Sequence, residues 1–172
     1  MTFASRLPIE GLHDIFLSSH PLEGVRAENA AAAVRIFIQR IHANQVRTIV
    51  VLLPSHELRE LYGDIDLLEM YRDEGLDVIH FPLENFSIPE KMEWFHGCIG
   101  SIEEKLRQGH VLIHCMAGCG RTGMMAAGVL VKLGLNAAEA IEQVRQTRPG
   151  SMDVLKQILF LRGYQRFLRE SC

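Results

Sequence analysis

The chain has 172 residues, of which 48% are hydrophobic, and its formal net charge is −3 at pH 7. This length fits one globular domain with a sizeable core, so we expect a single domain over residues 1–172. The weak negative charge gives no broad basic field for nucleic acid or for an anionic membrane, so any anion site must be a local pocket. The first residues lack a signal peptide's apolar segment, and the longest aliphatic run, residues 49–53, is far below the ~20 residues of a membrane span. We therefore expect a soluble, cytoplasmic protein.

Segments typical of strands and of helices alternate along the chain. Runs of aliphatic and β-branched residues predict strands at residues 11–19, 46–54, 76–83 and 110–115. Apolar spacings near 3.6 predict helices at residues 26–44, 56–75 (one or two), 88–109, 121–133, 136–147 and 152–170, with Asn136 as an N-cap. This alternation predicts an α/β fold with a central, largely parallel sheet flanked by helices on both faces. The binding site of such a sheet lies beyond the carboxyl ends of its strands.

A glycine-rich loop follows the last predicted strand. Its sequence, HCMAGCGRTG at residues 114–123, fits the spacing of the phosphate-binding loop G-x-x-x-x-G-K-[ST], with Cys115 in place of the first glycine and Arg121 in place of the lysine. A guanidinium offers two parallel N–H donors to one phosphoryl group. The glycines let the backbone curl, and the N-terminal end of the next helix adds positive dipole. We expect the phosphate-binding loop to consist of Met116, Ala117, Gly118, Cys119, Gly120 and Arg121.

Cys115 stands at the base of this predicted anion site. Thiols at helix N-termini beside a cation ionise readily, so we expect Cys115 to be a thiolate at neutral pH that can attack phosphorus. A cysteine before a glycine turn is otherwise a small buried hydrophobic residue. Cys119 could trap the nucleophile as a disulfide on oxidation, or could only fill space. The spacing of His114, Cys115 and Cys119 does not suit zinc, so we expect no metal.

The same segment resembles the H-C-x5-R-[ST] signature of the cysteine-dependent protein tyrosine phosphatases. PLENFSIPE at residues 82–90 resembles the general-acid loop of that superfamily, and RQTRPGS at residues 145–151 resembles a segment of its dual-specificity members. Residues 52–83 resemble the cyclin-dependent-kinase-associated phosphatases. The resemblance covers residues 45–168 and implies a compact dual-specificity phosphatase that needs no cofactor.

The resemblance assigns a role to each residue of the signature. Cys115 would attack phosphorus to give a cysteinyl-phosphate, and Arg121 would bind the phosphoryl oxygens until water hydrolyses the intermediate. Thr122 would hydrogen-bond the sulfur and help it leave. His114 would orient the loop from beneath, as a structural histidine rather than an acid or a ligand.

The resemblance is weaker at two further positions. Gln157 resembles the second glutamine of the family's water-positioning segment, but Asp153 replaces the first. At the position of the family's catalytic aspartate the chain has Asn85, which cannot donate a proton that it then recovers. Glu84 is adjacent and could substitute as the general acid, although a shift by one residue usually reverses the direction of a side chain.

Phosphoprotein is the favoured substrate class. Phosphoinositide phosphatases of this superfamily usually have basic residues inside the loop, where this chain has Met116 and Cys119. The alternatives are a phosphoinositide phosphatase and a pseudophosphatase that binds phosphorylated partners and, because of Asn85, turns over slowly. We expect a monomer that acts on phosphorylated protein and contacts neither nucleic acid nor membrane.

Overall fold

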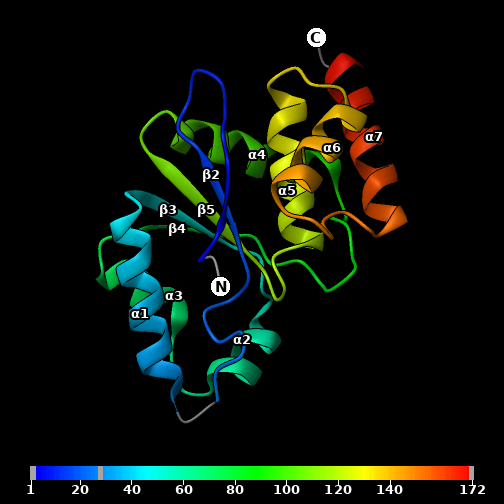
Figure 1. Ribbon diagram of the computed structural model, residues 1–172. Coiled ribbons are helices and arrows are strands. Elements are labelled where there is room, and N and C mark those ends of the chain that lie inside the picture. The colour runs from blue at the N-terminus through cyan, green and yellow to red at the C-terminus, as the bar shows by residue number, and fades with distance from the viewer. Residues whose placement is uncertain (1–2, 27–28, 171–172) are drawn as a thin grey trace.

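The computed structural model describes residues 3–26 and 29–170, and a five-stranded sheet forms its centre (Figure 1). The order across the sheet is β1-β2-β5-β3-β4, and the three pairs other than β1 with β2 are parallel. The strands are β1 (Ser5–Leu7), β2 (Ile15–Ser18), β3 (Val46–Val51), β4 (Asp77–His80) and β5 (His110–His114). The predicted α/β fold with a largely parallel sheet is confirmed.

In the described part of the chain, seven helices cover the two faces of the sheet. Figure 1 shows α1, α2 and α3 on one side and α4 to α7 on the other. Their bounds are α1 (Ala30–Ala43), α2 (Ser55–Tyr62), α3 (Leu67–Asp73), α4 (Met92–Leu106), α5 (Gly120–Lys132), α6 (Ala137–Thr147) and α7 (Leu155–Glu170). Among the described residues, no helix combines the length and the apolarity that crossing a bilayer requires.

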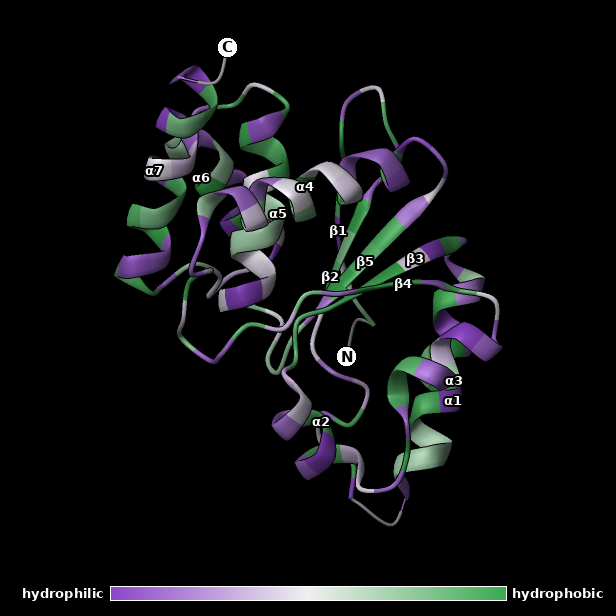
Figure 2. Cartoon of the chain, turned by 180° about the vertical axis from the view of Figure 1, so that it is seen from behind, coloured by the Kyte–Doolittle hydropathy of each residue, from purple (hydrophilic) through white to green (hydrophobic). Residues whose placement is uncertain are grey.

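Side chains of the central strands point alternately to the two faces of the sheet and so contribute to two separate cores. Val111 and Ile113 of β5 point into the core beneath α4 to α7, whereas Leu112 between them points into the core beneath α1 to α3. The strands are therefore apolar on both sides, as buried parallel strands must be, and Figure 2 shows this as green strands between the two helical layers. The end of β5 is consequently fixed by neighbours in every direction.

Several boundaries differ from those expected. β3 and β4 end at Val51 and His80, three residues before the predicted ends, and α7 begins at Leu155 rather than at residue 152. The predicted opening strand at residues 11–19 shortens to β2, and β1 before it was not predicted because only three residues pair there. The helix predicted over residues 88–109 begins at Met92. The backbone before it, from Pro82 to Lys91, is an irregular segment that crosses the N-terminal end of α5. In this segment the Ser87 carbonyl accepts a hydrogen bond from the side chain of Gln157 in α7. The predicted N-cap Asn136 is confirmed, with a full capping box.

Candidate active site

The glycine-rich loop joins the end of β5 to the start of α5. Cys115 follows the last residue of β5 and is only 3% exposed. Because β5 pairs with β2 on one side and β3 on the other, the loop leaves the sheet from a fixed point at its carboxyl edge. This is where the ligand sites of parallel sheets lie, as the sequence predicted.

Close packing against the end of β2 sets the shape of the loop. Gly118 has φ +71°, and a Cβ added there would lie 2.3 Å from the carbonyl oxygen of Ser18. Only glycine fits this position, both for its backbone conformation and for the space available. A Cβ at Gly120 would lie 3.3 Å from Oε1 of Gln157, so α7 also approaches the loop closely.

A pocket of about 270 Å³ opens above the loop. Four segments line it: residues 85–86, the loop itself, residues 150–154 between α6 and α7, and the first turn of α7. In Figure 1 these segments meet at the N-terminal end of α5. The pocket brings together most of the predicted site residues, namely Asn85, Cys115, Met116, Ala117, Cys119, Gly120, Arg121, Asp153 and Gln157.

Arg121 is anchored by a residue that the sequence did not reveal. Its Nη1 donates to both carboxylate oxygens of Glu57, at 3.1 and 3.0 Å, and to the carbonyl of Leu83 at 2.7 Å. Glu57 lies in the first turn of α2 and is also buried. Nη2 is buried as well, and in the described part of the chain it has no hydrogen-bond partner. Nη1 therefore holds the side chain in place and Nη2 is left for an anion.

Two further contacts turn the carbonyls of the loop outward. The guanidinium of Arg148 donates to the carbonyl of Ala117 at 2.9 Å, and the backbone N–H of His20 donates to the carbonyl of Met116 at 3.2 Å. In a trans peptide the N–H points opposite to the C=O. The next N–H groups, those of Ala117 and Gly118, are therefore directed away from these outer partners, as an anion-binding loop requires.

His114 lies beneath the loop and is fully buried. Its Nε2 is 3.3 Å from the hydroxyl of Tyr71 in α3. Burial lowers the pKa of His114 to about 3, and the same burial raises the pKa of Tyr71 well above its ordinary value. His114 is thus neutral at physiological pH, which suits the structural role expected of it. The fully buried Thr122 lies in the first turn of α5, and its contact with the sulfur stays a prediction.

The two candidates for the general acid lie differently. Glu84 does not line the pocket: its side chain is 64% exposed, and its Oε2 is 3.5 Å from Nε2 of His56. Asn85 does line the pocket, but its Oδ1 accepts from the N–H of Phe86 at 3.1 Å. Phe86 has φ +55° and a largely exposed ring beside the pocket. The one-residue offset between Glu84 and Asn85 therefore sends their side chains to different places.

Gln157 and Asp153 both line the pocket. Gln157 is fully buried and its Nε2 donates to the Ser87 carbonyl at 3.0 Å, while its Oε1 has no partner among the described residues. Asp153 is largely exposed, with Nη2 of Arg145 at 3.9 Å from its Oδ1. These two side chains thus supply one carboxylate and one free amide oxygen.

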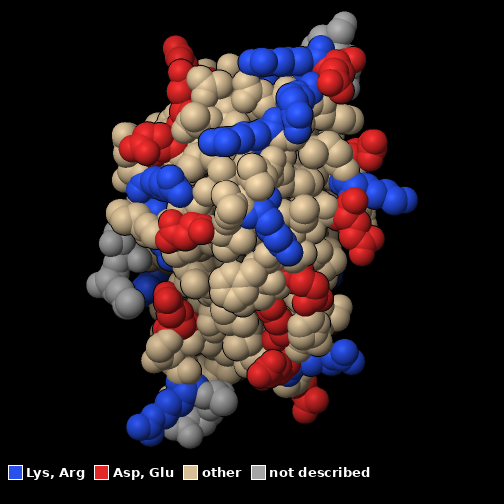
Figure 3. Space-filling view, turned by 90° about the vertical axis from the view of Figure 1, so that its right-hand side faces the viewer, with Lys and Arg blue, Asp and Glu red and all other residues tan. Residues whose placement is uncertain are grey.

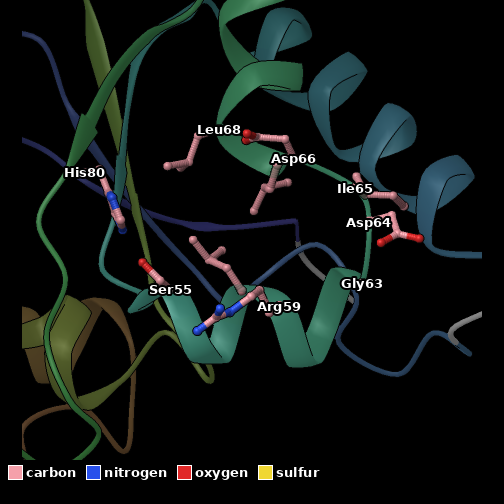
Figure 4. A pocket seen from close by; sticks show the side chains of 10 residues that line it. Ser55, Arg59, Gly63, Asp64, Ile65, Asp66, Leu68 and His80 are labelled. Atoms are coloured by element: carbon pink, nitrogen blue, oxygen red, sulfur yellow. The ribbon is translucent and has the colours of Figure 1, made fainter.

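Another pocket lies away from the Cys115 loop. A second pocket, of about 360 Å³, lies between α2 and α3 and is lined by Ser55, Arg59 and His80 among others (Figure 4). It shares no lining residue with the Cys115 pocket. On the face shown in Figure 3, acidic and basic side chains are interspersed, in keeping with the small net charge.

Comparison with known proteins defines the class. A family model described as "Polymorphic toxin system, DSP-PTPase phosphatase" matches residues 24–135. The chain is 30% identical over 136 residues to the PRL-1 phosphatase of Drosophila melanogaster, covering 75% of this chain and 69% of that protein. The chain therefore belongs to the dual-specificity type of cysteine-dependent protein tyrosine phosphatases, and the resemblance seen in the sequence is confirmed. It spans less than half the length of several other curated relatives.

Solved structures agree with this family. Tk-PTP in its active form is 27% identical, with a TM-score of 0.71 over 94% of this chain and 97% of that chain. Kinase associated phosphatase, solved with its catalytic-site cysteine replaced by serine, has a TM-score of 0.78 at 23% identity, over 91% of this chain and 88% of that chain. The second likeness concerns the fold alone.

Proposed function

We propose that the protein hydrolyses phosphotyrosine in protein substrates through a cysteinyl-phosphate on Cys115. The observation that carries this proposal is the convergence of Cys115 and an anchored Arg121 on one small pocket whose floor is the signature loop. The loop amides, the start of α5 and Nη2 of Arg121 would together hold a phosphoryl group.

The chemistry takes two steps. The Cys115 sulfur attacks phosphorus, the S–P bond forms, and the bond from phosphorus to the tyrosyl oxygen breaks. Water then attacks phosphorus from the side that the tyrosine has left, the S–P bond breaks, and inorganic phosphate and the thiolate are released. The free Oε1 of Gln157 accepts a hydrogen bond from that water, and Thr122 hydrogen-bonds the departing sulfur.

Substrate preference follows from the pocket walls. Of the described residues that line the pocket, Arg121 is the only one with a positive charge, so a head group with several phosphates would find little to bind. The exposed ring of Phe86 stands where it can stack on a substrate ring, a contact worth about 0.5–1.5 kcal/mol beyond area burial. An aryl phosphate on a peptide is therefore favoured over a phosphoinositide.

We propose further that the chain forms one catalytic domain that acts as a monomer in the cytoplasm. The pocket takes residues from α7 on one side of the sheet, and Glu57 of α2 on the other side anchors Arg121, so neither helical layer carries the site alone. A nucleophilic thiol also needs a reducing compartment to stay active.

Phosphate release from a phosphotyrosine peptide tests this function. Wild-type protein should turn over and be inhibited by vanadate, whereas Cys115→Ser should bind the peptide without turnover, because a hydroxyl is a far weaker nucleophile in the same cradle. Phosphoserine, phosphothreonine and phosphoinositide substrates run in parallel define the specificity. Peptide binding by the wild type without release of phosphate would instead support the pseudophosphatase that Asn85 suggests.

A further inference from the structure

One carboxylate in the described part of the chain lines the catalytic pocket, and it belongs to Asp153. It stands on the segment between α6 and α7 and lines the same pocket as Asn85 and Phe86. Its side chain is 73% exposed, which places it at the mouth, whereas Cys115 is almost fully buried at the base. Phosphoryl transfer puts the attacking and leaving atoms in line, so the leaving oxygen lies toward the mouth.

The segment that holds Glu84 and Asn85 offers no acid of its own. The carboxylate of Glu84 faces His56 outside the pocket. The carboxamide of Asn85 is held by the neighbouring backbone N–H and has no proton to give and recover. A leaving tyrosine must therefore be protonated from elsewhere.

The segment that bears Asp153 is held rigidly. Arg145 donates from Nε to the carbonyl of Ser151 at 3.2 Å and from Nη2 to the carbonyl of Met152 at 2.8 Å. Ser151 and Met152 are fully buried, and both Gly150 and Met152 have positive φ, at +81° and +61°. A non-glycine residue in this conformation persists only where its surroundings fix it. The backbone thus presents Asp153 to the pocket from a fixed position.

We propose that Asp153 is the general acid of this enzyme, in place of Glu84; this rests on the function proposed above. The protonated carboxyl of Asp153 donates its proton to the tyrosyl oxygen as the P–O bond breaks and the S–P bond forms. The resulting carboxylate takes a proton from water as the new O–P bond forms and the S–P bond breaks. The carboxyl is thereby restored, and Oε1 of Gln157, in the first turn of α7, holds the same water.

The test compares leaving groups. Tyrosine leaves as a phenol with a pKa of about 10 and needs the proton, whereas an activated aryl phosphate such as 6,8-difluoro-4-methylumbelliferyl phosphate hardly does. We expect Asp153→Asn to lower the ratio of the phosphotyrosine-peptide rate to the activated-substrate rate by about 10²-fold or more, the usual contribution of a positioned acid. Glu84→Gln is the competing variant, and Asp73→Asn on α3 is a matched surface control.

The outcomes separate the two proposals. An equal loss of rate on both substrates in Asp153→Asn would mean that the residue only shapes the pocket. A selective loss of the peptide rate in Glu84→Gln would make Glu84 the general acid. Either result overturns the inference and leaves the proposed function standing. If the wild type does not hydrolyse even the activated substrate in a Cys115-dependent way, both proposals fail.

Discussion

Replacing Glu57 by glutamine tests how Arg121 is held. Glutamine keeps the size and one acceptor oxygen of Glu57 but removes the charge, so one of the two contacts to Nη1 of Arg121, at 3.0 and 3.1 Å, is lost. Both side chains are buried, so water cannot replace the missing partner. Turnover should fall as well, because the guanidinium is no longer held in one orientation.

The size of the effect follows from that burial. A hydrogen bond to a charged group contributes about 1.5–3 kcal/mol, and this is the loss of unfolding free energy that we expect for Glu57→Gln. For a domain of this size, each kcal/mol lowers Tm by about 2–4 °C, so the variant should unfold roughly 3–12 °C below the wild type. Glu57→Ala, which leaves a buried charge without a partner, should lose about 3–5 kcal/mol.

Thermal and urea unfolding measure the loss, and a double-mutant cycle with Arg121→Met assigns it to the pair. Glu60→Gln is the control, because Glu60 lies on the same helix with an exposed side chain and should change stability by no more than about 0.5 kcal/mol. A Glu57→Gln variant that unfolds at the wild-type temperature, or a cycle in which the two changes add, would refute the anchoring role.

Three further predictions concern the loop. Gly118→Ala should lower kcat about 10²-fold, since the new Cβ would displace the loop from β2, whereas Gly97→Ala on α4, where the added Cβ meets open space, should leave kcat near the wild-type value. Burial keeps His114 neutral in the folded protein and lowers its pKa to about 3, whereas in the unfolded chain the side chain takes up a proton near pH 6.5. The contribution of His114 to the free energy of unfolding is therefore complete above pH 6.5 and is lost as the pH falls toward 3. Urea unfolding should show about 2 kcal/mol of this loss between pH 7 and pH 5, and His114→Gln should not show it. Mild peroxide should inactivate the enzyme and thiol should restore it, with a Cys115–Cys119 disulfide found by peptide mapping; unchanged recovery in Cys119→Ser would show that Cys119 has no protective role.

Local patterns were enough to predict most of the fold. The central strands are continuous apolar runs and the helices have clear boundaries, of which the capping box at Asn136 is an example. β1 was missed because a three-residue edge strand has no periodicity of its own and exists only through pairing with β2. The start of α4 was misplaced because the preceding segment is shaped by contact with α7 rather than by its own sequence.

The residues of the candidate site also fall into two groups, those that the sequence revealed and those that only the fold brings together. Cys115 and Arg121 were visible because their spacing within one loop carries the chemistry. Glu57 was not, since an acidic residue in the first turn of a helix is ordinary and only the folded chain brings it to Arg121. Arg148 reaches the loop through a similar long-range contact. Side-chain direction was visible only in part: the one-residue offset from Asn85 argued against Glu84, but no local pattern showed that Asp153 lines the pocket.

The dispersed origin of the pocket has a consequence for biosynthesis. A chain is made from its N-terminus, and Cys115 emerges before Arg148 and Gln157, which support the loop from α6 and α7. Until those segments are made and docked, the loop that follows Cys115 lacks these contacts. The loop therefore takes its final shape only after the last part of the chain has been made.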